Sequence, residues 1–316
     1  MTQERQDPPR ALVIGLGAMG AAILQRLHSQ GWDVAGVDPD FSALQRLRGL
    51  GFHVSERLTE VPTGFVGGCC LLTSLPDDKT VQAVVEQILE LPVRARPALF
   101  VETSTILPST IQAVEERLRA VAPVIDIAVS GGPDQVFSGT LISYVAGDEE
   151  TRVPLLSKLL IDLCDRVVAC PRLGDAKLVK ILNNTMGWAA TVVGAEVVAA
   201  GVASGLDRAW LVAALSTGNG RSHQFVKRFQ RLVDGDHATY FSLAMGQKDA
   251  RLGLALAQEL QAPARMTEAL HASLAEVKNV ELLGADIVAY YKHYESLIPN
   301  PRNNETTTTT TTTKEH

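Results

Sequence analysis

The chain is poor in cysteine, and its four cysteines have no spacing typical of a metal site or a disulfide framework. Cys69 and Cys70 are adjacent, and no histidine lies near Cys164 or Cys170. Zinc sites need C-x-x-C pairs or cysteines combined with histidines. The seven histidines likewise form no H-E-x-x-H or other ligand pattern. We therefore expect four buried thiols and no metal site.

An excess of positive charge and long apolar runs are also missing. The 316 residues include 29 Lys and Arg against 35 Asp and Glu, a formal net charge of -6. Such a chain has no general attraction to nucleic-acid phosphates or anionic lipids. The first ten residues lack the apolar core of a signal peptide, and no apolar run of membrane-spanning length follows. We expect a cytoplasmic protein that binds neither nucleic acid nor membranes.

Apolar strands alternate with helical segments through the first half of the chain. The expected strands cover residues 11–15, 33–38, 69–75, 98–105, 124–132, 140–147 and 166–170. Strands joined by helices form a doubly wound parallel sheet, which binds ligands at the carboxyl ends of its strands. The pattern predicts a Rossmann-type α/β domain over residues 1–173.

Strand signals stop at Gly174, where a helical pattern of about 30 residues, or about 45 Å, begins. Further helical segments cover residues 207–216, 222–233, 241–260, 264–282 and 285–296. We expect an all-helical domain over residues 174–298, joined to the first domain by the long helix. The threonine-rich tail, residues 299–316, cannot bury a core and is expected to be disordered.

A glycine-rich turn of the form G-x-G-x-x-G follows the first expected strand, inside a β-α-β unit of about 30 residues. In a dinucleotide-binding turn, the first glycine permits the tight turn. The second lets backbone amides approach a pyrophosphate, and the third lets the helix pack on the strand. A flexible loop is the alternative interpretation. The candidate cofactor contacts are Gly15, Leu16, Gly17, Ala18, Met19 and Gly20.

Asp38 ends the second expected strand, about 18 residues after Gly20. An acidic side chain there accepts hydrogen bonds from ribose hydroxyls and repels a 2′-phosphate. Because Pro39 and Asp40 follow it rather than an arginine, NAD is favoured over NADP as the cofactor. A solvated turn residue is the alternative for Asp38.

Three later strand ends supply further candidates. The loops after two of these strands are candidates for lining the cofactor crevice. Ordinary turns at strand ends would have the same sequence pattern. Their candidate residues are Leu75, Pro76, Thr103 and Thr105. At the third strand end, Ser130 precedes two glycines whose N–H groups no side chain covers, so this turn could hold a carboxylate. A simple turn or bulge is the alternative there.

Four motifs, in order along the chain, resemble the β-hydroxyacid dehydrogenase family, the group containing 3-hydroxyisobutyrate dehydrogenase and tartronate semialdehyde reductase. They are IGLGAMG (14–20), DIAVSGG (126–132) with SGTL (138–141), GDAKLVKILNN (174–184) and MGQKDARLGLA (245–255). The resemblance implies hydride transfer between a nicotinamide cofactor and a small 3-hydroxy acid or the corresponding semialdehyde. It also implies a homodimer or homotetramer.

The resemblance also implies roles for single residues. Lys180, on the long helix, is the general acid and base, and Asn184 helps to hold the substrate. The substrate carboxylate is bound by the third strand end, at Ser130, Gly131 and Gly132. Lys248 lies near the nicotinamide, and Lys177, which lacks an asparagine at the right offset, is assigned to the helix surface.

A lysine can serve as the acid and base if desolvation lowers its pKa. In oxidation, neutral Lys180 takes the hydroxyl proton as hydride leaves; in reduction, its ammonium protonates the carbonyl oxygen. A surface lysine is the alternative. Lys180 and Asp38 argue against an NADP-dependent imine reductase, which generally replaces the lysine, and Asn183 stands where 6-phosphogluconate dehydrogenases carry histidine. A non-catalytic protein that senses a dinucleotide is another interpretation of the sequence.

Departures from the family pattern leave the identity of the substrate open. The family usually has glycine at Ala176, proline at Ala128, and Gly-Ala at Asp134 and Gln135. Asp134 stands close to the expected carboxylate-binding turn. Its carboxylate could therefore select an unusual substrate or point to solvent.

Overall fold

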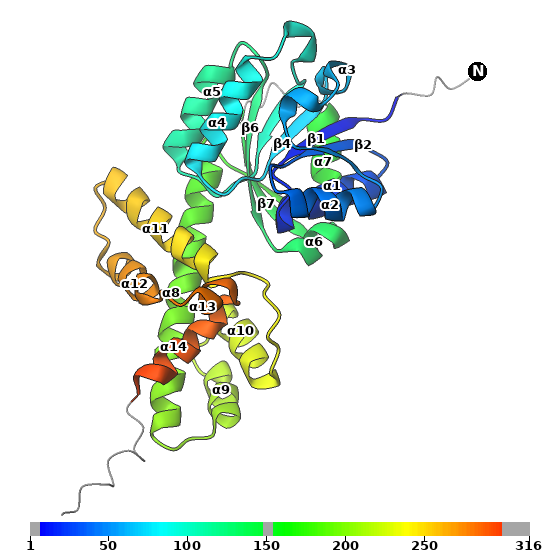
Figure 1. Cartoon of the computed structure of the whole chain (residues 1–316). Helices are drawn as coiled ribbons and strands as arrows, with labels where there is room; N and C mark the ends of the chain where they lie inside the picture. Colours follow the sequence, from blue (N-terminus) through cyan, green and yellow to red (C-terminus); the bar gives the residue numbers. More distant parts are fainter. Residues whose placement is uncertain (1–6, 148–153, 299–316) are drawn as a thin grey trace, which may run out of the picture. The chain divides into compact units, whose positions relative to one another are not determined.

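The computed structural model describes residues 7–147 and 154–298, and the chain divides into two compact units after Asn183. The first unit contains a sheet with helices on both faces, and the second is built from helices (Figure 1). The expected two-part α/β architecture is confirmed. The threonine-rich tail lies outside the described residues.

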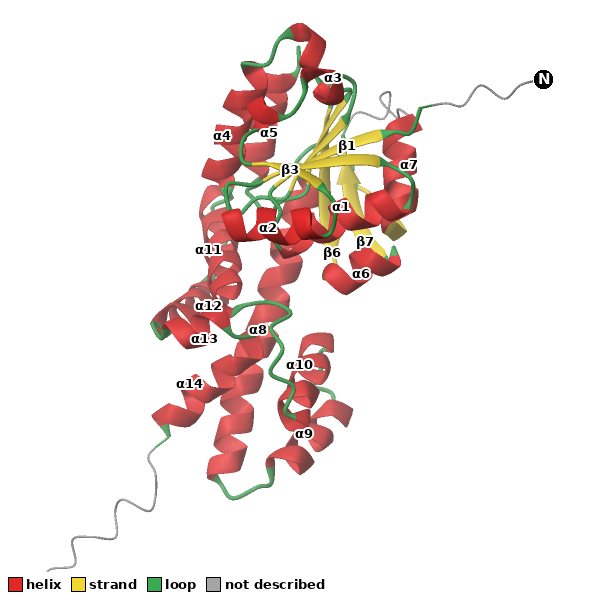
Figure 2. Cartoon of the chain, turned by 45° about the vertical axis from the view of Figure 1, so that its right-hand side comes forward, coloured by secondary structure: helices red, strands yellow, loops and turns green. Residues whose placement is uncertain are grey.

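Eight strands form a single sheet in the first unit (Figure 2). They are β1 (Arg10–Ile14), β2 (Asp33–Val37), β3 (His53–Ser55), β4 (Cys70–Thr73), β5 (Leu99–Glu102), β6 (Val124–Ser130), β7 (Leu141–Ala146) and β8 (Cys164–Ala169). Their order is β3-β2-β1-β4-β5-β6-β7-β8, and every neighbouring pair is parallel except β6 and β7.

The antiparallel pair, which the sequence did not predict, follows from a short connection. Only residues 131–140 join β6 to β7, and they include the helix α6 (Pro133–Ser138). A parallel crossover needs about a dozen residues or more. The chain therefore turns back, so that Ser130 pairs with Ile142.

Helices cover both faces of the sheet, as a doubly wound fold requires. One face packs against α1 (Ala18–Ser29), α2 (Phe41–Gly49) and α7 (Pro154–Leu163), and the other against α3 (Thr63–Val66), α4 (Asp78–Leu89) and α5 (Pro108–Leu118). Two short 3₁₀ helices, η1 (Leu58–Glu60) and η2 (Val93–Ala95), come directly before α3 and β5 along the chain. In β1, Ala11 and Val13 face one core while Leu12 and Ile14 face the other, which is the period of two expected of a buried strand.

The helix α8 (Asp175–Ala203) begins among the residues of the first unit and continues into the second. The second unit also contains α9 (Arg208–Thr217), α10 (His223–Asp234), α11 (Leu243–Glu259), α12 (Arg265–Glu276), α13 (Val280–Gly284), η4 (Ile287–Ala289) and α14 (Tyr290–Leu297). The single helix expected over 264–282 is therefore two. Tyr290 and Tyr291, near the end of the chain, are buried in this unit's core.

By length and composition alone, α8 could cross a membrane, which contradicts the expectation that the chain has no such run. Core helices of globular proteins can pass the same test. Here Trp188, Val192 and Val198 pack into the core of the second unit. Packing inside the protein therefore accounts for part of this apolar character.

The cysteines correct another expectation. Cys69 and Cys70 are buried, and burial raises the pKa of the Cys69 thiol to about 12. Cys164 and Cys170 are only half-buried, so the prediction of four buried thiols is wrong for these two, because β8 is the edge strand of the sheet. Among the described residues, no group of three or more His, Cys, Asp or Glu side chains could hold a metal ion.

Candidate dinucleotide and catalytic site

The glycine-rich turn between β1 and α1 is built so closely that two of its glycines tolerate no side chain. Gly15 has a φ of 92°, and its N–H donates to Val37 O at 2.8 Å. A Cβ on Gly15 would lie 2.3 Å from Ser74 O, and one on Gly20 would lie 1.8 Å from Gly15 O. Both positions therefore serve the close approach of α1 to the strands.

Gly17 differs, because the space beside it is open. A Cβ there would meet nothing within 4 Å. Gly17 is the N-cap of α1, no side chain caps this helix start, and its first turn contains no acidic residue. The unpaired N–H groups and the helix dipole make such a start a site for phosphate.

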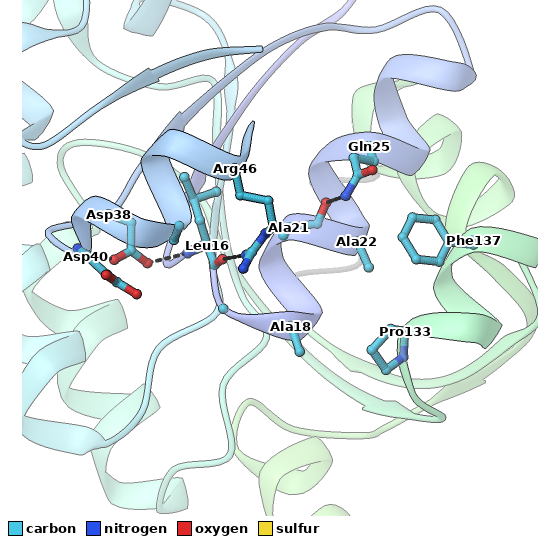
Figure 3. A pocket seen from close by; sticks show the side chains of 12 residues that line it. Leu16, Ala18, Ala21, Ala22, Gln25, Asp38, Asp40, Arg46, Pro133 and Phe137 are labelled. Atoms are coloured by element: carbon cyan, nitrogen blue, oxygen red, sulfur yellow. Dashed lines mark hydrogen bonds between the residues drawn. The ribbon is translucent and has the colours of Figure 1, made fainter. Parts of the chain in front are cut away.

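A pocket of about 390 Å³ opens beside this helix start (Figure 3). It brings together four of the predicted cofactor residues: Leu16, Gly17, Ala18 and Asp38. Leu16 is fully buried, and its side chain packs in the core of the first unit. Gly15, Met19 and Gly20 do not line the pocket, and Met19 packs against the core instead.

Asp38 is held at the rim of this pocket by backbone N–H groups. Its Oδ2 accepts a hydrogen bond from Leu16 N at 2.6 Å, and its Oδ1 accepts one from Asp40 N at 2.7 Å. Each carboxylate oxygen keeps a lone pair for a ribose hydroxyl. Hydrogen bonds donated by Ser42 hold the pKa of Asp40 below its ordinary value. Two acidic side chains therefore line the same side of the pocket.

Besides the four predicted residues, eight more residues line the pocket, and no sequence pattern identified them as site residues. Arg46, on α2, donates from Nη2 to Leu16 O at 3.3 Å and lies between Asp38 and α1 (Figure 3). The residues directly after Asp38 include no arginine, whereas α2 brings Arg46 to this position from further along the chain. Pro133 and Phe137 line the opposite side, on the helix α6 that no pattern predicted.

The two predicted crevice loops lie side by side but do not line this pocket. Leu75 N donates to Ser104 Oγ at 2.7 Å, and Thr103 Oγ1 donates to Thr73 O at 2.6 Å. These bonds hold the ends of β4 and β5 together. The four predicted residues therefore lie at the carboxyl edge of the sheet but are not among those that line the pocket beside Asp38. They are Leu75, Pro76, Thr103 and Thr105.

At the predicted carboxylate-binding turn, one of the expected donors is already engaged. Gly131 has a φ of 142°, and the Gly132 N–H donates to Gln135 Oε1 at 2.8 Å. Gln135 stands where the resembled family has alanine. A carboxylate bound through the Gly132 N–H would have to displace this side chain. The neighbouring Asp134 is exposed to solvent.

The two lysines of α8 have different environments, and the assignment of Lys177 to the helix surface is wrong. Its side chain is fully buried, with Nζ 3.1 Å from Asp126 Oδ1 and hydrogen bonds to Glu102 O and Ile127 O. These partners lie on strands far earlier in the sequence, so no local pattern revealed them. Lys180, one turn later, is half-buried.

In the second unit, Asn184 is buried and bound to Asp249 of α11. Asn184 Nδ2 donates to Asp249 Oδ2 at 2.7 Å, and the Trp188 indole N–H donates to the same oxygen at 3.1 Å. Asp249, which the sequence did not identify as part of a site, therefore fixes the orientation of the Asn184 amide. Lys248, the residue before it, is half-buried.

Comparison with known proteins connects both parts of the chain to one group of enzymes. Residues 11–170 match the family described as the NAD binding domain of 6-phosphogluconate dehydrogenase. Residues 174–294 match the family described as NAD-binding of NADP-dependent 3-hydroxyisobutyrate dehydrogenase. The chain belongs to the β-hydroxyacid dehydrogenase family. This membership makes it an NAD(P)-dependent hydroxy acid dehydrogenase and confirms the resemblance in the four motifs.

Two curated relatives illustrate the similarity. The L-threonate dehydrogenase of Cupriavidus necator is 27% identical over 267 residues, which cover 82% of this chain and 87% of the relative. The mitochondrial 3-hydroxyisobutyrate dehydrogenase of Mus musculus is 27% identical over 209 residues, covering 66% of this chain and 62% of the relative.

Solved structures share the fold. A 3-hydroxyisobutyrate dehydrogenase from Mycobacterium tuberculosis, solved with L-serine, has a TM-score of 0.78 at 23% identity and covers 90% of this chain and 99% of its own. An imine reductase from Pseudomonas sp. has a TM-score of 0.55 at 15% identity over 90% of this chain and 99% of its own. The latter similarity is thus weaker by both measures.

Proposed function

We propose that this protein is an NAD-dependent dehydrogenase of a small 3-hydroxy acid, with Lys180 as the general acid and base. The observation that carries the proposal is the uncapped start of α1 beside Asp38, in a chain of this family. Bound NAD supplies the group that accepts the hydride. The N–H groups at Gly17 and Ala18 would hold its pyrophosphate, and Asp38 would accept hydrogen bonds from its ribose.

The preference for NAD over NADP rests on charge. Asp38 and Asp40 both line the pocket, and an extra phosphate on the ribose would be placed beside two carboxylates. Arg46 lines the same pocket and donates from Nη2 to Leu16 O, so two carboxylates stand against one guanidinium there. We therefore expect NAD to bind more tightly than NADP.

The proposed role of Lys180 is supported by its place on α8. Its neighbour Lys177 bonds to Glu102 O at the end of β5 and to Ile127 O in β6. Lys180 stands three residues later, about 4.5 Å further along the helix. The helix start is therefore fixed beside the carboxyl end of β5 and the middle of β6. Sheets of this type bind ligands at the carboxyl ends of their strands. There, neutral Lys180 would take a proton from the substrate hydroxyl during oxidation and return it during reduction.

The proposed substrate is a small carboxylate. L-threonate and 3-hydroxyisobutyrate, the substrates in the names of the two relatives, are both hydroxy acids. The Ser130 hydroxyl and the N–H of Gly131 are candidate donors to a carboxylate group, while Gln135 competes for the Gly132 N–H. Replacing Gln135 with the alanine of the resembled family would free that donor.

The direct test is a screen of 3-hydroxy acids, including L-threonate and 3-hydroxyisobutyrate, with NAD and NADP, following the absorbance of the reduced nicotinamide. We expect turnover with at least one acid and tighter binding of NAD in a fluorescence titration. Tighter binding of NADP would contradict the cofactor preference. Turnover of cyclic imines, with none of any hydroxy acid, would replace the proposed reaction with imine reduction.

A further inference from the structure

Lys177 is a buried cation for which the proposed chemistry has no direct use. Its Nζ lies 2.8 Å from Glu102 O, 3.0 Å from Ile127 O and 3.1 Å from Asp126 Oδ1. An ammonium group has three donors. Here it has three oxygen atoms around it, and neither Lys177 nor Asp126 is exposed to solvent.

The partner carboxylate bonds to the helix at a second point. Asp126 Oδ2 accepts a hydrogen bond from Gly174 N at 3.0 Å, directly before α8 begins. Gly174 has a φ of 95°, a conformation that suits glycine. One carboxylate of β6 thus holds both the backbone before α8 and a side chain in its first turn.

The charges of this cluster balance within the pair. Among the described residues, Asp126 Oδ1 accepts no hydrogen bond, so the ion pair with Lys177 compensates its charge. Glu102, on the neighbouring strand, is also buried, and its carboxyl accepts hydrogen bonds from Thr73 Oγ1 and Ser104 N. Burial raises the pKa of Glu102, which favours its neutral form.

We propose that Lys177 and Asp126 form a buried clamp that positions Lys180 for proton transfer. The clamp connects the first turn of α8 to the adjacent strands β5 and β6. It therefore fixes the position of the helix along its axis and its rotation about that axis at Lys180. This inference rests on the proposed role of Lys180. Lys177 is a positioning residue in it, since it acts through the helix rather than on the substrate.

A role in stability alone would not require this arrangement. A buried ion pair can often be replaced by apolar side chains of similar volume without loss of stability, whereas removing one partner leaves an uncompensated charge. A methionine at position 177 would fill much of the same space. The two possibilities can therefore be separated by comparing a single with a double substitution.

The test uses the full chain with the substrate and cofactor found in the screen. Lys177→Met leaves Asp126 unpaired, and we expect a lower unfolding midpoint together with a kcat reduced about 10- to 100-fold. The double variant Asp126→Asn, Lys177→Met removes both charges, and its asparagine can still accept the Gly174 N–H. We expect the double variant to regain the unfolding midpoint but not kcat, with KM and the dissociation constant of NAD within about twofold of wild type.

Lys79→Met is the matched control, because Lys79 is exposed on α4. It should leave both stability and kcat unchanged. A double variant with wild-type kcat would contradict the clamp, as would full kcat in Lys177→Met. If Lys180→Ala retained full turnover, the proposed function itself would fail, whereas an inactive Lys180→Ala beside a fully active Lys177→Met would overturn only the clamp.

Discussion

Two helices of the first unit begin after glycines with left-handed backbone, but the two helix starts are completed in different ways. α1 follows Gly15, with a φ of 92°, and α8 follows Gly174, with a φ of 95°. Within the described part of the chain, no side chain caps α1. At α8, the Gly174 N–H donates to buried Asp126, which also pairs with Lys177.

The difference shows how one structural device serves two purposes. A helix start without protein acceptors can bind the phosphates of a ligand through its N–H groups. A helix start whose preceding N–H group donates to a carboxylate of the protein is instead fixed in place. In this protein the first arrangement suits a cofactor that enters and leaves. The second suits the positioning role that we propose for α8.

The largest effect we expect is at the start of α1, for Gly20→Ala. The new Cβ would lie 1.8 Å from Gly15 O, a backbone atom that cannot move away alone. We expect a loss of about 3 kcal/mol in the free energy of unfolding, the upper part of the usual range for overpacking. Urea unfolding measures it. A variant as stable as wild type would show that the turn relaxes.

Gly17→Ala is the matched substitution and should separate stability from binding. Gly17 has a φ of -61°, and its Cβ would meet nothing within 4 Å. We expect stability within about 0.5 kcal/mol of wild type but weaker NAD binding, because the methyl group occupies the space in which the pyrophosphate approaches the backbone. Unchanged NAD affinity in a titration would place the phosphates elsewhere.

A smaller, pH-dependent effect is expected beside the clamp, for Glu102→Gln. Burial raises the folded-state pKa of Glu102 above its ordinary value of 4.5. The folded state therefore binds this proton more tightly, and the associated stability is present below pH 4.5 and is lost as pH rises through the folded-state pKa. Glutamine cannot ionise. As pH increases from 4.5, the free energy of unfolding of Glu102→Gln should therefore increase relative to that of wild type, by at most about 1.4 kcal/mol per pH unit.

Urea unfolding of both proteins between pH 4.5 and pH 8 tests this expectation. Because the other titrating groups are shared, the difference between the two curves isolates Glu102. Curves that stay parallel across this range would mean that the protonation of Glu102 does not differ between the folded and unfolded states.

Much of the fold could be predicted because its signals are local. Apolar runs separated by helical segments predict where most strands lie along the chain, and the glycines between Gly15 and Gly20 predict the first turn. The three-residue edge strand β3 has too few residues to show a period. The direction of β7 depends on the length of a connection, and α6 within it has only six residues.

Parts of the candidate site could not be predicted because they depend on contacts between distant segments. The spacing of Asp38 from the glycines is local in the sequence and predicts its place beside the turn. Arg46 reaches the same pocket because α2 packs on the same face of the sheet as α1. Lys177 resembles a surface lysine in its helix, and its burial becomes evident only when β5 and β6 place Glu102 and Asp126 beside it.

The most direct test of the account is the rate of hydride transfer in Lys180→Ala, measured in a single turnover with NAD bound. Lys180 is the only residue changed, and Lys177 and Asp126 remain to hold α8. We expect NAD to bind as in wild type while hydride transfer slows by at least about 10²-fold, the contribution usual for a general acid or base. Hydride transfer at the wild-type rate would contradict the central claim.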